Sequence, residues 1–196
     1  MKNRRRNNSP LPDFPRGARR VFKGKIFDVY QWKQKLFDGS YGTFERLKRP
    51  DTVTIIPILG NGKVMIVREQ QPGTKSFLSV IGGRVDPGER IIEAARRELL
   101  EETGYSAGKL IPWLSWRPYN KIVWTIYVFI AKNCKKVAPI HLDAGEKIKP
   151  KFITLDKLIN LVLMGNVRLP MELTQMILRA KANPREMKKL RKLFSK

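Results

Sequence analysis

The arrangement of apolar and polar residues predicts a chain rich in strands, with one strongly marked helix near its middle. Apolar residues alternate with polar ones from Val21 to about Lys48, and Asp38-Gly39 interrupts the alternation as a hairpin turn would. Asn61-Gly62 marks a second turn, between two β-branched runs. Strands are expected at 52–59, 63–68, 111–114, 122–131 and 151–154.

The segment from Ile91 to Thr103 is the clearest helix of the sequence. Pro87-Gly88 precedes it, Gly104 follows it, and its apolar residues recur at helical spacing. Further helices are expected at 155–164, from Pro170 to about 180, and at 185–194, where the alternative is a frayed basic tail. Strands on both sides of a central helix, followed by later helices, predict an α+β fold in which helices cover a mixed sheet.

The composition indicates a folded protein of one domain, or of one domain with a small extension. Of its 196 residues, 42% are hydrophobic and 29% are charged, which is enough apolar material for a core. The longest apolar run, at 122–131, is far shorter than the ~20 residues that span a bilayer, and the first ten residues lack the apolar segment of a signal peptide. The single cysteine, Cys134, excludes an internal disulfide. We therefore expect a cytoplasmic protein with no membrane partner.

The net charge of +23 is distributed unevenly along the chain. Residues 1–25 carry nine Lys and Arg against one acid, and residues 179–196 carry eight against one. These basic termini are typical of solvated segments that aid solubility, and the alternative is that they bind nucleic acid. Six of the 17 acids fall within residues 83–105. Carboxylates concentrated in one short segment of a basic protein indicate cation binding.

That acidic segment reads GRVDPGERIIEAARRELLEETGY and brings three carboxylates together on one helix. Glu98 and Glu102 are four residues apart and share a face, and Glu101 lies beside Glu102. Like charges at this spacing cost a helix about 0.2–0.5 kcal/mol per pair, whereas hard cations such as Mg²⁺ prefer oxygen ligands. Arg97 lies one turn before Glu101 and can orient it by a charge-assisted hydrogen bond. Three isolated glutamates would more simply form an exposed helix with ordinary salt bridges.

The full spacing of the segment resembles the box that defines the Nudix hydrolases. The matching positions are Gly83, Glu89, Arg97, Glu98, Leu99, Glu101, Glu102, Gly104 and Tyr105. The resemblance implies an α/β/α sandwich with a mixed sheet, and cleavage of a diphosphate with Mg²⁺, or alternatively Mn²⁺, as the cofactor. The metal ligands that it implies are the Gly82 carbonyl and the carboxylates of Glu98, Glu101 and Glu102. It further implies that Arg97 and Glu101 are catalytic and that Glu89 ties the loop to the helix.

Residues 21–180 also resemble ADP-ribose pyrophosphatases and related NDP-sugar hydrolases. The similarity rests on N-terminal strands that end in FERLKRPD and on the acidic loop LDAGEKI at 142–148. It also rests on Pro118, which lies close to, but not at, the position of the proline typical of ADP-ribose hydrolases. We therefore expect a basic flexible arm at 1–20, an N-terminal strand segment at 21–50, a Nudix domain at 51–180 and a basic tail or helix at 181–196.

The resemblance also implies where the substrate lies and how the subunits associate. In such relatives the N-terminal strands exchange between two subunits, which implies a homodimer and substrate contacts from Glu45 or Arg46. Trp113, Trp116 and Tyr119 lie near where relatives bind a base. Trp116 and Tyr119 are the candidates for stacking on the base of the substrate, and the alternative is that these aromatic residues belong to the core.

The acidic loop is expected to supply the general base of the reaction. Glu146 is the first candidate and Asp143 is the reserve. Relatives often carry a second acid two residues before the position of Glu146, where this chain has Ala144. The identity of the base therefore stays open, because a base must reach the attacking water within ~2.6–3.2 Å.

Three functional hypotheses follow from these features. The first is hydrolysis of ADP-ribose to AMP and ribose 5-phosphate. The second is hydrolysis of capped or triphosphorylated RNA 5′ ends, which the basic termini favour. The third is a nucleotide- or RNA-binding module on the same scaffold, which the intact carboxylates of the box argue against.

Overall fold

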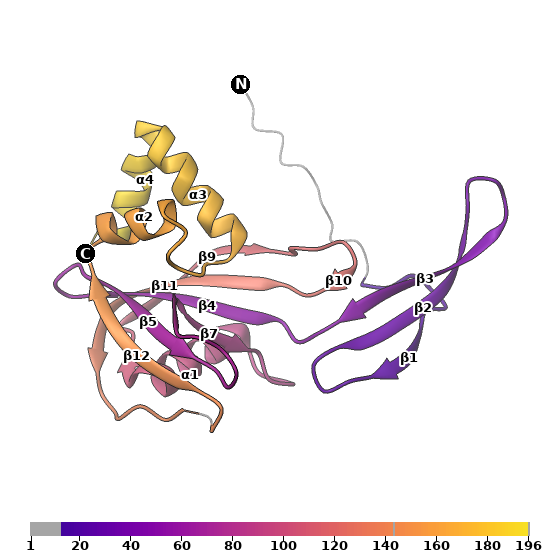
Figure 1. The fold of residues 1–196 in the computed structure, drawn as a ribbon, viewed down its shortest axis with the longest axis horizontal. Coiled ribbons are helices and arrows are strands. Elements are labelled where there is room, and N and C mark those ends of the chain that lie inside the picture. Colours follow the sequence, from indigo (N-terminus) through magenta and orange to yellow (C-terminus); the bar gives the residue numbers. More distant parts are fainter. Residues whose placement is uncertain (1–12, 143, 196) are drawn as a thin grey trace. The chain divides into compact units, whose positions relative to one another are not determined.

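The computed structural model describes residues 13–142 and 144–195. These residues form two units, each with its own sheet (Figure 1). Unit 1 contains the chain up to Pro50 together with Arg117–Thr125, and unit 2 contains Asp51–Trp116 and the chain from Ile126 onward.

Unit 1 is a sheet of four strands within the described residues, in the order β1–β2–β3–β10. The strands are β1 (Arg19–Lys23), β2 (Asp28–Lys35), β3 (Tyr41–Lys48) and β10 (Ile122–Val123). The first three are antiparallel, and β10 pairs with β3 in parallel. The predicted turn at Asp38-Gly39 joins β2 to β3, since Gly39 has a φ of 88° and the Asp38 carboxylate accepts the Ser40 backbone N–H at 2.9 Å. The predicted antiparallel N-terminal segment is thereby confirmed.

Unit 2 contains a sheet of eight strands, counted over the described residues. Five follow the order β12–β5–β4–β11–β8, and three more pair with this path: β6 with β5, β7 with β4 and β9 with β11. Their bounds are β4 (Thr52–Leu59), β5 (Val64–Gln70), β6 (Phe77–Ser79), β7 (Ile81–Arg84), β8 (Tyr105–Ser106), β9 (Lys109–Trp116), β11 (Ile126–Lys136) and β12 (Lys147–Ile153). The pairing of β4 with β11 is parallel and the others are antiparallel, which confirms the predicted mixed sheet.

Helices cover both faces of the unit 2 sheet (Figure 1). They are α1 (Ile91–Thr103), α2 (Leu155–Leu163), α3 (Met171–Ala182) and α4 (Pro184–Phe194). On the α1 side, Ala94, Ala95 and Leu99 pack in one buried cluster with Val53 and Ile55 of β4. The other three helices lie on the opposite side and bury their own apolar residues. The predicted α/β/α arrangement is confirmed. None of the helices in the described part of the chain is long and apolar enough to cross a membrane.

The C-terminal segment is a packed helix and not a frayed tail. Leu190 and Phe194 of α4 are buried. Arg191 forms an ion pair with Asp156 of α2 at 2.5 Å, and the Lys132 ammonium donates to the Ser195 carbonyl at 2.6 Å. These contacts make α4 part of unit 2.

Several strand boundaries differ from the prediction, including those of β5 and β9 by one or two residues. The strand predicted at 122–131 is interrupted after Val123, so that β10 belongs to unit 1 and β11 begins at Ile126 in unit 2. Trp124, in the interruption, lies under the Arg49 guanidinium, 4.3 Å from the ring centroid. The strand predicted at 151–154 begins earlier, at Lys147, because it pairs with β5 along that strand's whole length. β1 begins at Arg19, inside the stretch expected to be an arm, and residues 1–12 lie outside the described residues.

Candidate active site

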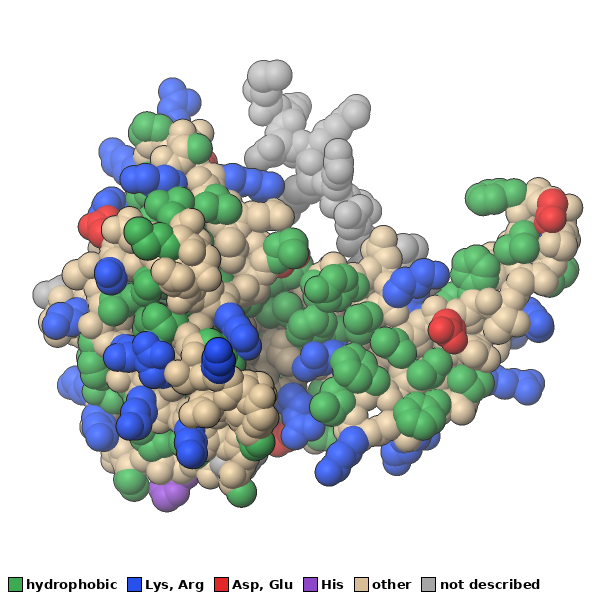
Figure 2. Space-filling view, viewed as in Figure 1, with side chains coloured by type: hydrophobic (Ala, Val, Ile, Leu, Met, Phe, Trp, Pro, Cys, Tyr) green, Lys and Arg blue, Asp and Glu red, His purple; other side chains and the backbone are tan. Residues whose placement is uncertain are grey.

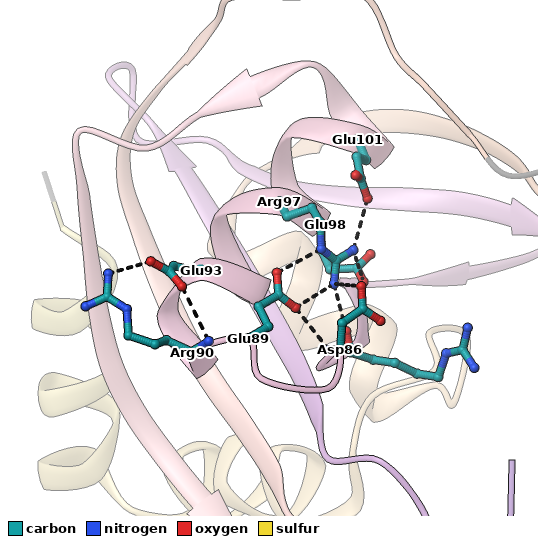
Figure 3. Close-up of polar contacts among 8 residues, drawn as sticks. Asp86, Glu89, Arg90, Glu93, Arg97, Glu98 and Glu101 are labelled. Atoms are coloured by element: carbon teal, nitrogen blue, oxygen red, sulfur yellow. Dashed lines mark hydrogen bonds and ion pairs between the residues drawn. The ribbon is translucent and has the colours of Figure 1, made fainter.

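Helix α1 holds the acidic segment in place because local interactions define both of its ends. At the start, the Arg90 backbone N–H donates to the Glu93 carboxylate at 3.4 Å, and the two side chains form an ion pair (Figure 3). At the end, Gly104 adopts a left-handed conformation with φ 72°, and its N–H donates to the Leu100 carbonyl at 2.7 Å. The buried apolar face then fixes the rotation of the helix about its axis.

This rotation gives the three glutamates of the box different environments. Glu102 is 7% exposed and the Glu98 side chain is 13% exposed, whereas the Glu101 side chain is 45% exposed. Gly83 of β7 permits the close approach of this strand to α1, and Gly82 permits its close approach to β4. A Cβ at Gly83 would overlap the Glu98 carboxylate, and a Cβ at Gly82 would overlap the Val53 carbonyl.

Arg97 is the centre of the hydrogen-bond network (Figure 3). Its Nε and Nη2 donate to the two carboxylate oxygens of Glu89 at 2.9 and 3.0 Å, a bidentate arrangement. Its Nη1 donates to Glu98 at 2.9 Å and to Glu101 at 3.1 Å. Its Nη2 also donates to the Arg84 carbonyl at 2.9 Å, which joins the helix to β7. The hydrogen bond from Arg97 lowers the pKa of Glu89 and raises the pKa of the guanidinium.

The largely buried Glu98 carboxylate and the buried Glu102 carboxylate are electrostatically unfavourable in their charged forms without a counter-charge. Burial raises the pKa of Glu98, and Arg97 only partly opposes this effect. Burial also raises the pKa of Glu102 to about 9, and repulsion from Glu98 adds to the shift. Smaller repulsions come from Glu146 and Glu69, while a hydrogen bond from the Gly82 backbone acts in the opposite direction. Carboxylates in such a site are stabilised when a cation joins them.

These side chains line a cavity of about 620 Å³. Its acidic lining residues are Glu69, Asp86, Glu98, Glu101, Glu102 and Glu146, and its arginines are Arg84 and Arg97. A cavity with this excess of acid repels a diphosphate unless cations come between them. Within the described residues, no three acidic, His or Cys side chains are arranged to hold a metal ion by themselves. A Mg²⁺ site completed by water and substrate phosphates fits this arrangement, because Mg²⁺ usually takes one or two carboxylates.

Glu69 is a member of the cavity that the sequence analysis did not identify. It lies on β5, where its carboxylate accepts the Ser79 hydroxyl at 2.8 Å and the Gln71 side-chain amide at 2.9 Å. The sequence of β5 nevertheless indicates a buried position for Glu69, because Met65, Val67 and Glu69 lie two residues apart and so share one face of the strand. A carboxylate that continues a buried face is a candidate site residue.

The acidic loop brings Glu146 to the cavity, together with His141. The His141 backbone N–H donates to the Glu101 carbonyl at 2.9 Å, which attaches the loop to the end of α1. Asp143, the reserve candidate for the base, lies outside the described residues.

The four residues expected to contact the substrate are not among those that line this cavity. Glu45, Arg46 and Tyr119 belong to unit 1, and Trp116 ends β9 in unit 2. Glu45 accepts a hydrogen bond from the Gln31 amide at 3.1 Å, and Tyr119 stacks on Trp124 with ring centroids 6.4 Å apart.

Two of these residues have buried donor atoms that find no hydrogen-bond partner among the described residues. Arg46 donates through Nη1 to the Asp13 carbonyl at 2.7 Å, but its Nε has no hydrogen-bond partner. The indole nitrogen of Trp116 is likewise buried and unpartnered. Unsatisfied buried donors are rare in folded proteins and are candidates for ligand contacts.

Comparison with known proteins identifies the family. The model of the NUDIX domain matches residues 48–171. The chain is 28% identical over 145 residues to the ADP-ribose pyrophosphatase of Bacillus subtilis (strain 168), a match that covers 72% of this chain and 78% of that protein. It is 34% identical over 93 residues to the ADP compounds hydrolase NudE of Escherichia coli (strain K12), covering 46% and 50%.

A solved structure supports the same fold. The crystal structure of an ADP compounds hydrolase superposes with a TM-score of 0.62 at 24% sequence identity, over 74% of this chain and 80% of the other. The family model covers more than half of the chain and includes both β7 and α1, the elements that build the acidic cavity. This protein therefore belongs to the Nudix hydrolase family and resembles its ADP-ribose pyrophosphatases.

Proposed function

We propose that the protein hydrolyses the diphosphate bond of a nucleoside diphosphate derivative with Mg²⁺ as cofactor, and that its substrate is ADP-ribose, which is converted to AMP and ribose 5-phosphate. The observation that carries this proposal is the acidic cavity on α1, in which the charged forms of the largely buried Glu98 and the buried Glu102 carboxylates would be stabilised by a cation. The identity of the nucleotide rests on the relatives named for ADP-ribose and ADP compounds.

The residues present fit a Mg²⁺ site. Glu98 and Glu102 would hold the ion most directly, with Glu101 and the Gly82 carbonyl as further oxygen ligands. When bound, the ion would neutralise charge on the diphosphate and make a bound water more acidic. The shape of the site depends on Gly83, since any side chain there would overlap the Glu98 carboxylate.

The chain's own side chains prepare and complete the reaction. Arg97 holds the Glu98 and Glu101 carboxylates in fixed orientations through Nη1, and Glu89 holds Arg97. Glu146, with Asp143 as the reserve, would accept the proton of the water that attacks phosphorus. The oxygen of that water forms a new P–O bond, the bridging P–O bond breaks, and the leaving phosphate oxygen takes the electron pair. One water is consumed and two phosphate monoesters are released.

Recognition of the nucleoside is proposed for Glu45, Arg46, Trp116 and Tyr119. The unpartnered donors of Arg46 and Trp116 support a polar ligand contact at each residue. Their contribution is expected mainly in KM, because contacts remote from the reacting phosphorus act equally on substrate and transition state.

We also propose a homodimer in which a second copy covers the exposed apolar face of unit 1. Figure 2 shows hydrophobic side chains gathered over this unit. They include Val21, Phe22, Ile26, Phe27, Phe37, Tyr41 and Phe44, each at least 36% exposed. Large exposed apolar patches mark interaction surfaces. Light scattering after gel filtration should give twice the chain mass, and Phe22→Glu should lower it while the control Met164→Glu does not. A monomeric wild-type protein would contradict the dimer.

The test of the reaction is a substrate panel with Mg²⁺, read by mass spectrometry. The panel contains ADP-ribose, a GDP-sugar, a UDP-sugar, a dinucleoside polyphosphate, NADH and a 5′-triphosphate RNA. The expected result is fastest conversion of ADP-ribose to AMP and ribose 5-phosphate, with no conversion in EDTA. Turnover of RNA alone would contradict the proposed substrate and support the second hypothesis, and turnover in EDTA would contradict the metal requirement.

A further inference from the structure

A groove on the opposite side of the unit 2 sheet from α1 has no part in the proposed hydrolysis. It has a volume of about 440 Å³, within the usual range of ligand sites. Its floor is apolar, made by Trp113, Met176, Ala180, Leu190 and Leu193, and the charged residues that line it are Arg179, Glu186 and Lys189. The groove therefore combines an aromatic surface with cations at its edge.

Trp113 reaches this groove because of an irregularity in strand β9. Along β9, Pro112 pairs with Phe129 and Leu114 pairs with Val128, so Trp113 is the extra residue of a β-bulge. Bulges re-aim side chains, and they are over-represented beside binding sites. The Trp113 indole meets the Phe194 ring edge-on, with centroids 6.0 Å apart, and remains only partly buried. One side of a large aromatic ring is thereby kept available in the groove.

Helix α4 carries a row of cations that meets the groove at Lys189, the member of the row among the groove's lining residues. Arg185, Lys188, Lys189 and Lys192 follow the spacing i, i+3, i+4 and i+7, which places them on one face of the helix, and all four are exposed. At ~1.5 Å per residue the row is about 10 Å long. Figure 2 shows Lys and Arg side chains around the helical end of unit 2, with hydrophobic side chains between them. We define these four residues as the α4 row.

The α4 row is electrostatically costly in the protein alone. Each like-charge pair at i,i+3 or i,i+4 costs a helix about 0.2–0.5 kcal/mol. In the described residues, the ion pair between Lys189 and Glu186, at 2.7 Å, is the salt bridge found for the row. A polyanion laid along the helix would relieve this repulsion and release its own counterions.

The packing of α4 distinguishes nucleic acid from a membrane surface as the partner. A helix that lies in a membrane interface must expose its apolar face to lipid. Here that face is occupied, because Leu190 and Phe194 are buried within unit 2. The surface left for a partner consists of the cationic row and the aromatic groove beside it. That combination suits single-stranded nucleic acid, because cations can contact its phosphates and an aromatic ring can stack on one of its unpaired bases.

We propose that the α4 row and the Trp113 groove bind single-stranded nucleic acid, with a base against Trp113 and phosphates along the row. This activity is separate from the diphosphate hydrolysis and uses none of the residues of the acidic cavity. RNA and DNA single strands share the chemistry that the surface recognises.

The test is fluorescence anisotropy of the full chain with labelled 15-nucleotide RNA and DNA single strands, a duplex of the same length, and anionic lipid vesicles. Lys188→Glu with Lys192→Glu should weaken single-strand binding at least about tenfold and reduce the slope of log K against log salt by roughly 1.4, for two phosphate contacts. The matched control is Lys149→Glu with Lys151→Glu, which changes the net charge equally on strand β12. Its effect should be much smaller.

Trp113 provides an independent arm of the same experiment. Trp113→Leu should weaken single-strand binding about fivefold or more while duplex binding stays unchanged, and Trp113→Tyr should restore most of the loss because it keeps an aromatic ring. Melting temperatures close to the wild-type value verify that the variants fold. Equal losses for the α4 and β12 pairs, no effect of Trp113→Leu, or binding to vesicles but not to RNA or DNA would overturn the proposal.

Discussion

The buried Glu102 should make the metal-free protein less stable at neutral and alkaline pH. Burial and the neighbouring carboxylates raise its pKa in the folded state to about 9, from an ordinary value of 4.5. Between these values the folded protein keeps a proton on Glu102 that the unfolded chain has released. Because the folded state then binds more protons, its stability falls as pH rises through this window. Replacement by Gln removes the titration and keeps the shape of the side chain.

The size of the effect follows from the pKa difference. One pKa unit corresponds to about 1.4 kcal/mol. A pH of 7.5 lies three pH units above the ordinary pKa of 4.5. This difference sets an upper limit of about 4 kcal/mol on the loss of folding stability. Relaxation around the carboxylate and the weaker hydrogen bond from Gly82 to a neutral acceptor reduce the expected gain for Glu102→Gln to about 1–3 kcal/mol.

The assay is urea unfolding in EDTA at pH 5 and pH 8, for wild type, Glu102→Gln and the control Glu93→Gln. Glu93 is an exposed residue of the same helix and is paired with Arg90. Glu102→Gln should be the most stable of the three at pH 8, and the difference should shrink toward pH 5. Saturating Mg²⁺ should stabilise wild type and Glu93→Gln but have little effect on Glu102→Gln. A Glu102→Gln protein that is less stable than wild type at pH 8 in EDTA would refute the reasoning.

Three further substitutions test the geometry of the cavity. Gly83→Ala should lower kcat about 100-fold at an unchanged melting temperature, since its methyl group displaces the Glu98 carboxylate; a normal kcat would show that this contact is unimportant. Arg97→Lys keeps the charge but loses the bidentate contact with Glu89, and should weaken Mg²⁺ activation about 10- to 100-fold, measured as the Mg²⁺ concentration for half-maximal rate. Glu146→Gln should lower kcat by about 10²–10⁴ if it is the general base, and a small effect in steady-state assays would transfer that role to another group.

Several elements of both units follow from local sequence patterns. Helix α1 was predicted with the bounds that the structure has, because Gly104 ends it and its apolar residues define one face. The turns at Asp38-Gly39 and Asn61-Gly62 were also predicted correctly, since glycine at positive φ is required there. These features depend on residues close together in the chain.

Features that depend on distant partners were missed. The interruption between β10 and β11 occurs because Val123 pairs with Lys48 of β3, whereas Ile126 pairs with Thr52 of β4. The apolar pattern at 122–131 does not indicate that the partner strand changes there. The burial of Glu102 follows from packing against β7, and helical spacing alone could not distinguish it from the half-buried Glu101. The sequence did not decide between a helix and a frayed tail at 185–194, because the ion pair of this segment with Asp156 is a long-range contact.

The measurement that tests the central claim most directly is the steady-state rate of ADP-ribose hydrolysis with Mg²⁺ for wild type, Glu102→Gln and Glu93→Gln. If the buried carboxylates of α1 hold the catalytic metal, Glu102→Gln should lose activity by orders of magnitude although it folds, and Glu93→Gln should keep the wild-type rate. A near-normal rate for Glu102→Gln, or an equal loss in both variants, would contradict the account.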